Sequence, residues 1–261
     1  MRGGGSPVEG GRSPSPRRAG PAALAIALLF VSLTITSCGA SLAADIRADS
    51  SAMVEFSVEM PAPVADKLRR LGAAGGGTYD PASPLFNLAA IRAGIAENPE
   101  LSLQALTQPS PESLRGRILV VSLPGLASMP EMKDSGTLAY AEGADWKELR
   151  LLLRRGANAG LAALLPGLDP GLLEALSPPA IAEEGEAVEA EDYRAMLKSV
   201  FGTKGLAALE AASVDVELKA PTAVIASGGG RLEERKLTAK LPIIDLLLLE
   251  KPIELRLRWK K

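Results

Sequence analysis

The sequence contains no histidine, and Cys38 is its one cysteine. Without histidine, neither a Ser-His-Asp nor a Cys-His nucleophile system can be assembled. Zinc sites made from histidines or from four cysteines are excluded as well. We therefore predict no catalytic residues, no metal and no cofactor, and we expect a protein that is not an enzyme. The enzymatic alternative left open is a hydrolase that uses carboxylates alone, although no carboxylate pair is evident.

Aromatic residues are also scarce, at 3% of the 261 residues, whereas hydrophobic residues make up 47%. The core must therefore consist mainly of Leu, Ala, Val and Ile. So few aromatics do not favour a stacking platform for carbohydrates or single-stranded nucleic acid. The formal net charge of the whole chain is −2. Four basic residues, Arg2, Arg12, Arg17 and Arg18, precede Cys38, so the part of the chain after Cys38 is more acidic than the whole. The acidic remainder argues against a nucleic-acid partner.

The first part of the chain has the order of an export signal. Residues 1–20 are rich in Gly, Pro, Ser and Arg, and we predict that they are disordered. An uncharged apolar run, 21–35, follows Arg17 and Arg18, and it is shorter than the roughly 20 residues that span a bilayer. Basic, apolar and then small residues are typical of a secretory signal, so 1–37 is predicted to be a signal peptide.

The end of this segment reads Ile35, Thr36, Ser37, Cys38, and it resembles the bacterial lipobox. The resemblance implies that the Cys38 thiol receives a diacylglyceryl group and that signal peptidase II cuts before Cys38. The alternative is an ordinary cleaved signal with an incidental cysteine. Lipidation accounts better for a lone cysteine in an oxidising compartment, and two or three acyl chains anchor a protein stably. The predicted partner is a membrane, and the predicted location is the cell envelope, at the outer membrane or facing the periplasm.

Residues 38–44 are predicted to be a lipidated tether that spans at most about 20 Å. A single α+β domain over 45–261 should then sit close to the bilayer. Alternating apolar and polar residues predict its strands, and apolar residues at helical spacing predict its helices. Predicted strands are 45–49, 54–60, 101–107, 117–123, 137–142, 147–154, 214–218, 223–226, 236–241 and 253–260. Predicted helices are 64–71, one starting at Pro84 after a Ser83 cap, 158–165, one starting at Asp169, 193–201 and 206–211.

The strands lack regular helical crossovers, which favours antiparallel pairing. The predicted fold class is therefore α+β, a mixed or antiparallel sheet with several helices packed on one face.

The layout is similar to that of uncharacterised spirochaetal lipoproteins, especially from treponemes, which resemble in turn the LppM-type domain of mycobacterial lipoproteins. The similarity depends on the strand pair over 45–60 and on the segments 214–221, 237–242 and 255–259. This chain departs from the pattern where Thr222 follows Pro221, in place of glycine. The resemblance implies a fold and a location and carries no catalytic residues.

An acidic stretch contains Glu183, Glu184, Glu186, Glu189, Glu191 and Asp192. It could bind a cation, but it lacks the spacing of an EF-hand. The alternative, which we favour, is a solvated linker whose last members stabilise the start of the 193–201 helix.

The most apolar run after the signal is 241–250. It either forms a hydrophobic contact, as a loop touching lipid or as the lip of a ligand cavity, or it fills the core, which is usual for such runs. The candidate contact residues are Ile243, Ile244, Leu246, Leu247, Leu248 and Leu249. The leading functional hypothesis is a lipid-anchored envelope protein with a binding or structural role. The alternative is a carrier or chaperone for lipids or other hydrophobic ligands.

Overall fold

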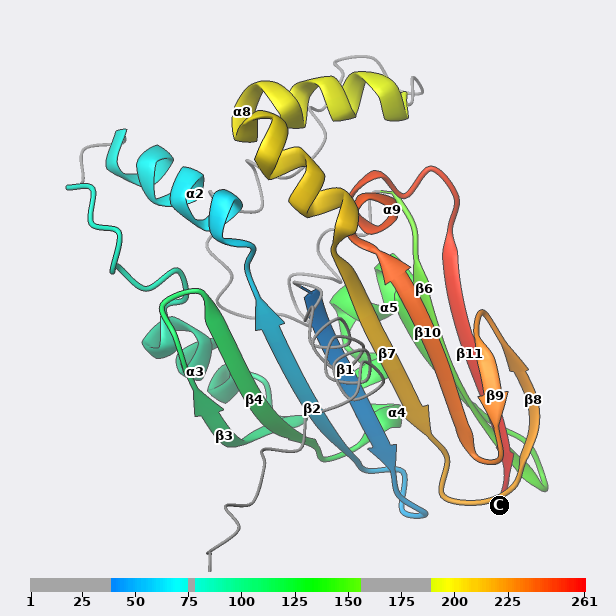
Figure 1. Cartoon of the computed structure of the whole chain (residues 1–261). Coiled ribbons are helices and arrows are strands. Elements are labelled where there is room, and N and C mark those ends of the chain that lie inside the picture. Colours follow the sequence, from blue (N-terminus) through cyan, green and yellow to red (C-terminus); the bar gives the residue numbers. More distant parts are fainter. Residues whose placement is uncertain (1–38, 75–77, 156–188) are drawn as a thin grey trace, which may run out of the picture. The chain divides into compact units, whose positions relative to one another are not determined.

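The computed structural model describes residues 39–74, 78–155 and 189–261 (Figure 1). The chain divides into two units, Met1–Thr36 and Ser37–Lys261, and every described residue belongs to the second. The predicted signal peptide, the lipobox with Cys38, and the helices predicted at 158–165 and after Asp169 lie outside the described residues.

A seven-stranded sheet has the order β3-β4-β2-β1-β7-β10-β9. β1 and β7 are parallel, and the remaining neighbours in this order are antiparallel, so the sheet is mixed. Its strands are β1 (Gly39–Ile46), β2 (Ala52–Glu59), β3 (Leu101–Thr107), β4 (Ser113–Val120), β7 (Ser213–Lys219), β9 (Arg231–Glu233) and β10 (Lys236–Pro242).

A second, antiparallel sheet has the order β5-β6-β11-β8. Its strands are β5 (Leu138–Glu142), β6 (Trp146–Leu153), β8 (Val224–Gly228) and β11 (Ile253–Lys260). The chain passes from β8 in this sheet to β9 in the other through Gly229, which has a φ of 81°. A Cβ atom at Gly229 would clash with the backbone oxygen of Glu254, so only glycine fits this crossing.

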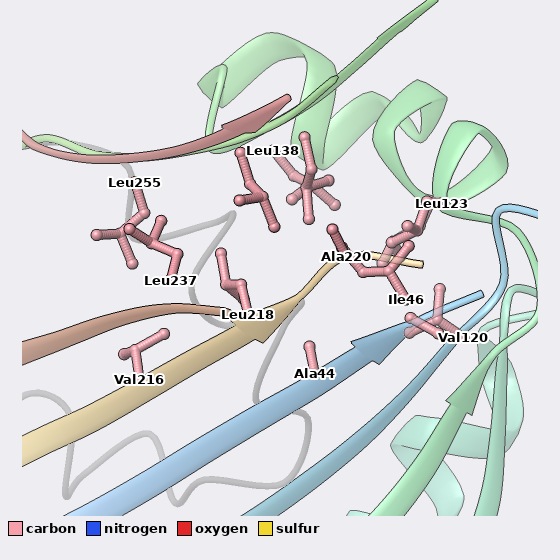
Figure 2. Close-up of a cluster of buried hydrophobic side chains, with 14 of the residues drawn as sticks. Ala44, Ile46, Val120, Leu123, Leu138, Val216, Leu218, Ala220, Leu237 and Leu255 are labelled. Carbon is pink, nitrogen blue, oxygen red and sulfur yellow. The ribbon is translucent and has the colours of Figure 1, made fainter. Parts of the chain in front are cut away.

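The two sheets pack against one another through a shared apolar core (Figure 2). The seven-stranded sheet contributes one face, because Leu42, Ala44 and Ile46 alternate along β1 with polar or small residues. The short helices α4 (Leu123–Ser128) and α5 (Pro130–Ser135) close the core beside β5. Buried members from the sheets include Ala44, Ile46, Val216, Leu218, Leu237, Leu149, Leu255, Leu257 and Trp259.

Helix α3 (Leu88–Glu97) forms a second apolar cluster with β3 and β4, in which Ile91 and Ile95 are buried. The helix starts at Leu88, because the Asn87 side chain accepts a hydrogen bond from the Ala90 backbone N–H. The prediction that this helix begins at Pro84 after a Ser83 cap is therefore wrong.

Helices α2 (Ala62–Ala74), α8 (Ala190–Ala211) and α9 (Ile243–Leu248) form a third cluster. α8 is two helices joined by a kink at Gly202, whose φ of 73° and ψ of 175° interrupt the helix. This confirms the two helices predicted on either side of that glycine. The buried members are Val64, Tyr193, Leu197, Phe201, Leu209, Ile244 and Leu248.

The α+β class is confirmed, and, besides the start of α3, two features of the sheets differ from the predictions. The first is the second sheet. The second is β1, because residues 39–44, which we predicted as a tether, form its first six positions. The predicted strand 45–49 ends at Ile46, since Asp49 accepts hydrogen bonds from the N–H and Oγ of Ser51 and so forms a turn.

Candidate functional site

The candidate lipidation site, Cys38, and its lipobox residues Ile35, Thr36 and Ser37 lie outside the described residues, but the residue that follows them does not. Gly39 is the first residue of β1 and pairs with Ser213, the first residue of β7. Pro242, the last residue of β10, pairs with Ser213 from the other side. These residues, with Glu59 at the end of β2, mark one end of the seven-stranded sheet, which we call the anchor end.

The helices of the third cluster are all connected to the anchor end (Figure 1). α2 begins shortly after Glu59, α8 ends shortly before Ser213, and α9 follows Pro242 directly. The Ile243 backbone N–H donates to the oxygen of Ala212 at 3.0 Å, which joins the start of α9 to the end of α8. Sequence segments far apart in the chain therefore meet at this end of the sheet.

The apolar run over 243–249 lies within this region, and none of its six candidate contact residues is exposed. Ile244 and Leu248 are buried in the helix cluster, and Ile243 and Leu247 pack against it. Leu249 is buried as well, and Leu246 packs against the core between the sheets. The run thus fills the interior of the domain here.

The outer surface of α2 carries exposed apolar and basic side chains. Leu71 is 40% exposed, and Tyr79, which follows the helix in the chain, is 38% exposed. The Arg70 guanidinium lies over the Tyr79 ring, 4.6 Å from its centroid. We call Lys67, Arg70, Leu71 and Tyr79 the α2 patch.

Asp66 joins two members of the α2 patch, Arg70 and Tyr79. Its carboxylate accepts hydrogen bonds from Arg70 Nε at 2.9 Å and from Tyr79 Oη at 2.5 Å. The bond from Arg70, and then that from Tyr79, lower the pKa of Asp66, so this carboxyl stays charged at neutral pH.

An ion pair fixes α2 against the sheet. Arg69 Nη2 lies 2.6 Å from Glu112 Oε1, and Arg69 Nε donates to the backbone oxygen of Ser83 at 2.7 Å. The side chain of Arg69 is only 7% exposed, which is unusual for arginine and limits screening by water. The bond from Arg69 lowers the pKa of Glu112.

The opposite end of the sheets has a polar cluster that our sequence analysis missed. Ser50 Oγ lies 2.8 Å from Tyr140 Oη and accepts a hydrogen bond from Lys147 Nζ at 2.7 Å. Lys147 also donates to the oxygen of Ala48, and burial raises the pKa of Tyr140. The sequence pattern could have revealed this cluster. Lys147 lies on the same face of its strand as Leu149, and Leu149 is buried between the sheets.

A pocket of about 320 Å³ lies next to this cluster and is lined in part by Glu142, Lys147, Thr222 and Lys261. Its charged groups bond to one another, as Lys261 Nζ lies 3.0 Å from Glu142 Oε2. The bond from Lys261 lowers the pKa of Glu142.

The second face of the seven-stranded sheet is polar. Cross-strand ion pairs cover it, among them Lys219 with Asp45 at 2.9 Å and Lys236 with Glu217 at 3.2 Å. An open groove of about 540 Å³ crosses β1, β7, β10 and β9 on this face. The residues that line the two pockets all come from strands, their loops and the last residues of the chain, and none from helices α2, α8 or α9.

Within the described ranges, no helix is long and apolar enough to cross a membrane. The same residues include no group of three or more Asp, Glu, Cys or His side chains arranged to hold a metal ion. Of the acidic stretch, Glu191 and Asp192 lie in the first turn of α8, and Glu189 precedes the helix without a side-chain cap bond. Glu183, Glu184 and Glu186 lie outside the described residues.

No family model matches the sequence, and none of the curated proteins matches it significantly. Among solved structures, the chain is similar to the NMR structure of the folded domain of the Mycobacterium tuberculosis LppM protein. The TM-score is 0.36 and the identity 13%, over 86% of this chain and 91% of that chain. Likeness of this degree establishes neither a shared family nor a shared function, and nothing found supports the spirochaetal family.

Proposed function

We propose that this chain is a lipid-anchored lipoprotein of the cell envelope that works by binding or structural contact and not by catalysis. The observation that carries the proposal is that Gly39, the residue directly after Cys38, already lies in β1 and pairs with Ser213 of β7. All seven strands described for the large sheet come from residues after Cys38, so cleavage before that residue removes none of them. The division of the chain between Thr36 and Ser37 lies next to the same bond.

The binding role is supported by the surfaces of the domain. The interior clusters are filled by aliphatic side chains, including the 243–249 run. The two pockets described above lie on strand surfaces, and charged side chains such as Asp215, Glu217 and Lys147 form part of their lining. The packed interior favours a binding or structural role over the alternative role, a carrier of lipids or other hydrophobic ligands.

The test is metabolic labelling of the full chain in a bacterial host with a radioactive fatty acid. We expect the wild-type chain to be labelled and to sediment with membranes, and Cys38→Ala to lose both properties. Ser37→Ala is the matched control, because it keeps a small residue beside the cysteine and should still be labelled. Continued labelling of Cys38→Ala would refute the proposal.

A further inference from the structure

The position of Gly39 within the large sheet bears on which surface of the domain would face the membrane. Gly39 follows Cys38 directly, and Cα atoms of consecutive residues lie about 3.8 Å apart. A lipid on Cys38 therefore leaves the domain at the anchor end, without a linker that would let the domain turn freely. We infer that the anchor end faces the lipid headgroups, with α2, α8 and α9 on the membrane side of the domain beside the point where the lipid leaves it. This inference rests on the proposed lipidation.

The helices must meet the membrane because of where they are attached. α2 continues from the end of β2, and α8 leads into the start of β7, so both lie beyond the strand ends that flank Gly39. Acyl chains that begin at Cys38 enter the bilayer beside the bases of these helices. The exposed surface of the helices consequently lies at headgroup depth.

The α2 patch has the chemistry of a surface at that depth. Tyr79 presents an amphipathic ring and Leu71 an exposed aliphatic side chain, and such residues are favoured where one side is apolar and the other wet. Lys67 and Arg70 beside them suit the phosphates of headgroups. Asp66 offsets only one of these two charges, because it is bonded to Arg70. The occupant of the patch is the bilayer that holds the chain's own lipid.

The opposite end of the domain then points away from the bilayer. β1 has eight residues, which at about 3.3 Å each span roughly 26 Å. The turn at Ala48, the pocket of about 320 Å³ and the Ser50–Tyr140–Lys147 cluster lie at that far end. Soluble partners of the domain would reach this end first.

The orientation can be tested by fluorescence quenching on the lipidated chain in vesicles of phosphatidylglycerol and phosphatidylethanolamine. Because Cys38 is the one cysteine and is consumed by the lipid, an introduced cysteine is the single thiol available for a dye. Leu71→Cys places the dye on the α2 patch, and Ala48→Cys places it on the exposed turn at the far end. Vesicles with a spin-labelled headgroup should remove most of the fluorescence at position 71 and none at position 48.

Equal quenching at the two positions would overturn the inference, as would stronger quenching at position 48 or no quenching at either. Mass spectrometry of the same samples reports whether Cys38 carries acyl chains. A sample without them refutes the proposed function itself, whereas an acylated sample with the wrong quenching pattern refutes only the orientation. Both substituted positions are exposed, so folding should be preserved, and circular dichroism checks this.

Discussion

Gly202 and Gly72 are two exposed glycines in helices of the anchor end, and they differ in backbone conformation. Gly202 has a φ of 73° and a ψ of 175°, at the kink of α8, whereas Gly72 lies inside α2. A Cβ atom added to either would meet no other atom within 4 Å. Any difference between alanine substitutions at the two sites therefore reports backbone conformation and not packing.

We expect Gly202→Ala to lower the free energy of unfolding by about 1–3 kcal/mol, because this φ and ψ are accessible almost only to glycine. Gly72→Ala should raise it by roughly 0.5–1 kcal/mol, because alanine favours the helix and restricts the unfolded chain. Urea denaturation measures both values. Similar effects at the two positions would contradict the kink.

Tyr193 should make stability depend on alkaline pH. Burial among α2, α8 and α9 raises the pKa of its phenol above the ordinary value of 10. Above pH 10 the unfolded chain releases this proton while the folded protein keeps it, so the unfolded state binds fewer protons. The free energy of unfolding should therefore fall as the pH rises above 10. Tyr193→Phe should show a smaller fall than wild type in urea titrations between pH 8 and pH 11.

At the scale of elements, the sequence predicted what depends on neighbouring residues. β3 and the two halves of α8 form where we expected them, and the first half of α8 has a clear helical periodicity. The assignment of strands to two sheets was not predictable, because β6 and β11 alternate in the same way as strands of the large sheet. The first six residues of β1 were missed because Gly39–Ala44 contains a single large apolar residue, Leu42, and their strand state depends on β2 and β7 on either side.

The attachment of α2 to the sheet should depend on Glu112. Glu112→Gln removes the charge opposite Arg69, whose buried guanidinium then lacks a counterion. We expect the free energy of unfolding to fall by about 1–3 kcal/mol. Glu55→Gln is the control, because the Glu55–Arg117 pair is more than half exposed and should be worth less than about 1 kcal/mol. A larger loss at Glu55 than at Glu112 would show that this account of α2 is wrong.

α9 should contribute to stability as part of the interior. Leu248 is 3% exposed and packs in the helix cluster, so Leu248→Ala leaves a cavity that costs about 2–5 kcal/mol. Leu71→Ala removes the same atoms from an exposed position and should cost less than about 0.5 kcal/mol. Thermal and urea unfolding of the two variants measure the difference. Equal costs would indicate that α9 does not pack as described.

At the scale of the whole molecule, β1 joins two halves of the large sheet. On one side it pairs with β2, which leads to β4 and β3, and on the other with β7, which leads to β10 and β9. The candidate lipidation site was readable from a local motif in the sequence. The sequence did not reveal that the residue after this site lies at the helical end of the domain. That position depends on the pairing of β1 with β7, which joins residues as far apart as Asp45 and Lys219, separated by 174 positions.

A chain that begins at Gly39 should therefore fold, whereas one that begins at Arg47 should not. The first retains all the strands of both sheets, and the second lacks the strand that joins β2 to β7. Near-ultraviolet circular dichroism of Trp146 and Trp259, with urea unfolding, tests this. A cooperative transition in the chain that begins at Arg47 would mean that β1 is dispensable for the fold, in keeping with the tether predicted over 38–44.

For a chain that is exported and lipidated as proposed above, the parallel pairing of β1 with β7 has a consequence for the order of events during export. A secreted chain emerges with its amino end first, so β1 with β2, β3 and β4 reaches the far side of the membrane long before β7 does. Lipid transfer to Cys38 can occur while the edge of β1 still has no partner. Unpaired edges invite aggregation, and distant pairings form slowly. An early lipid would hold this open edge at the membrane surface, apart from other nascent chains, until β7 arrives.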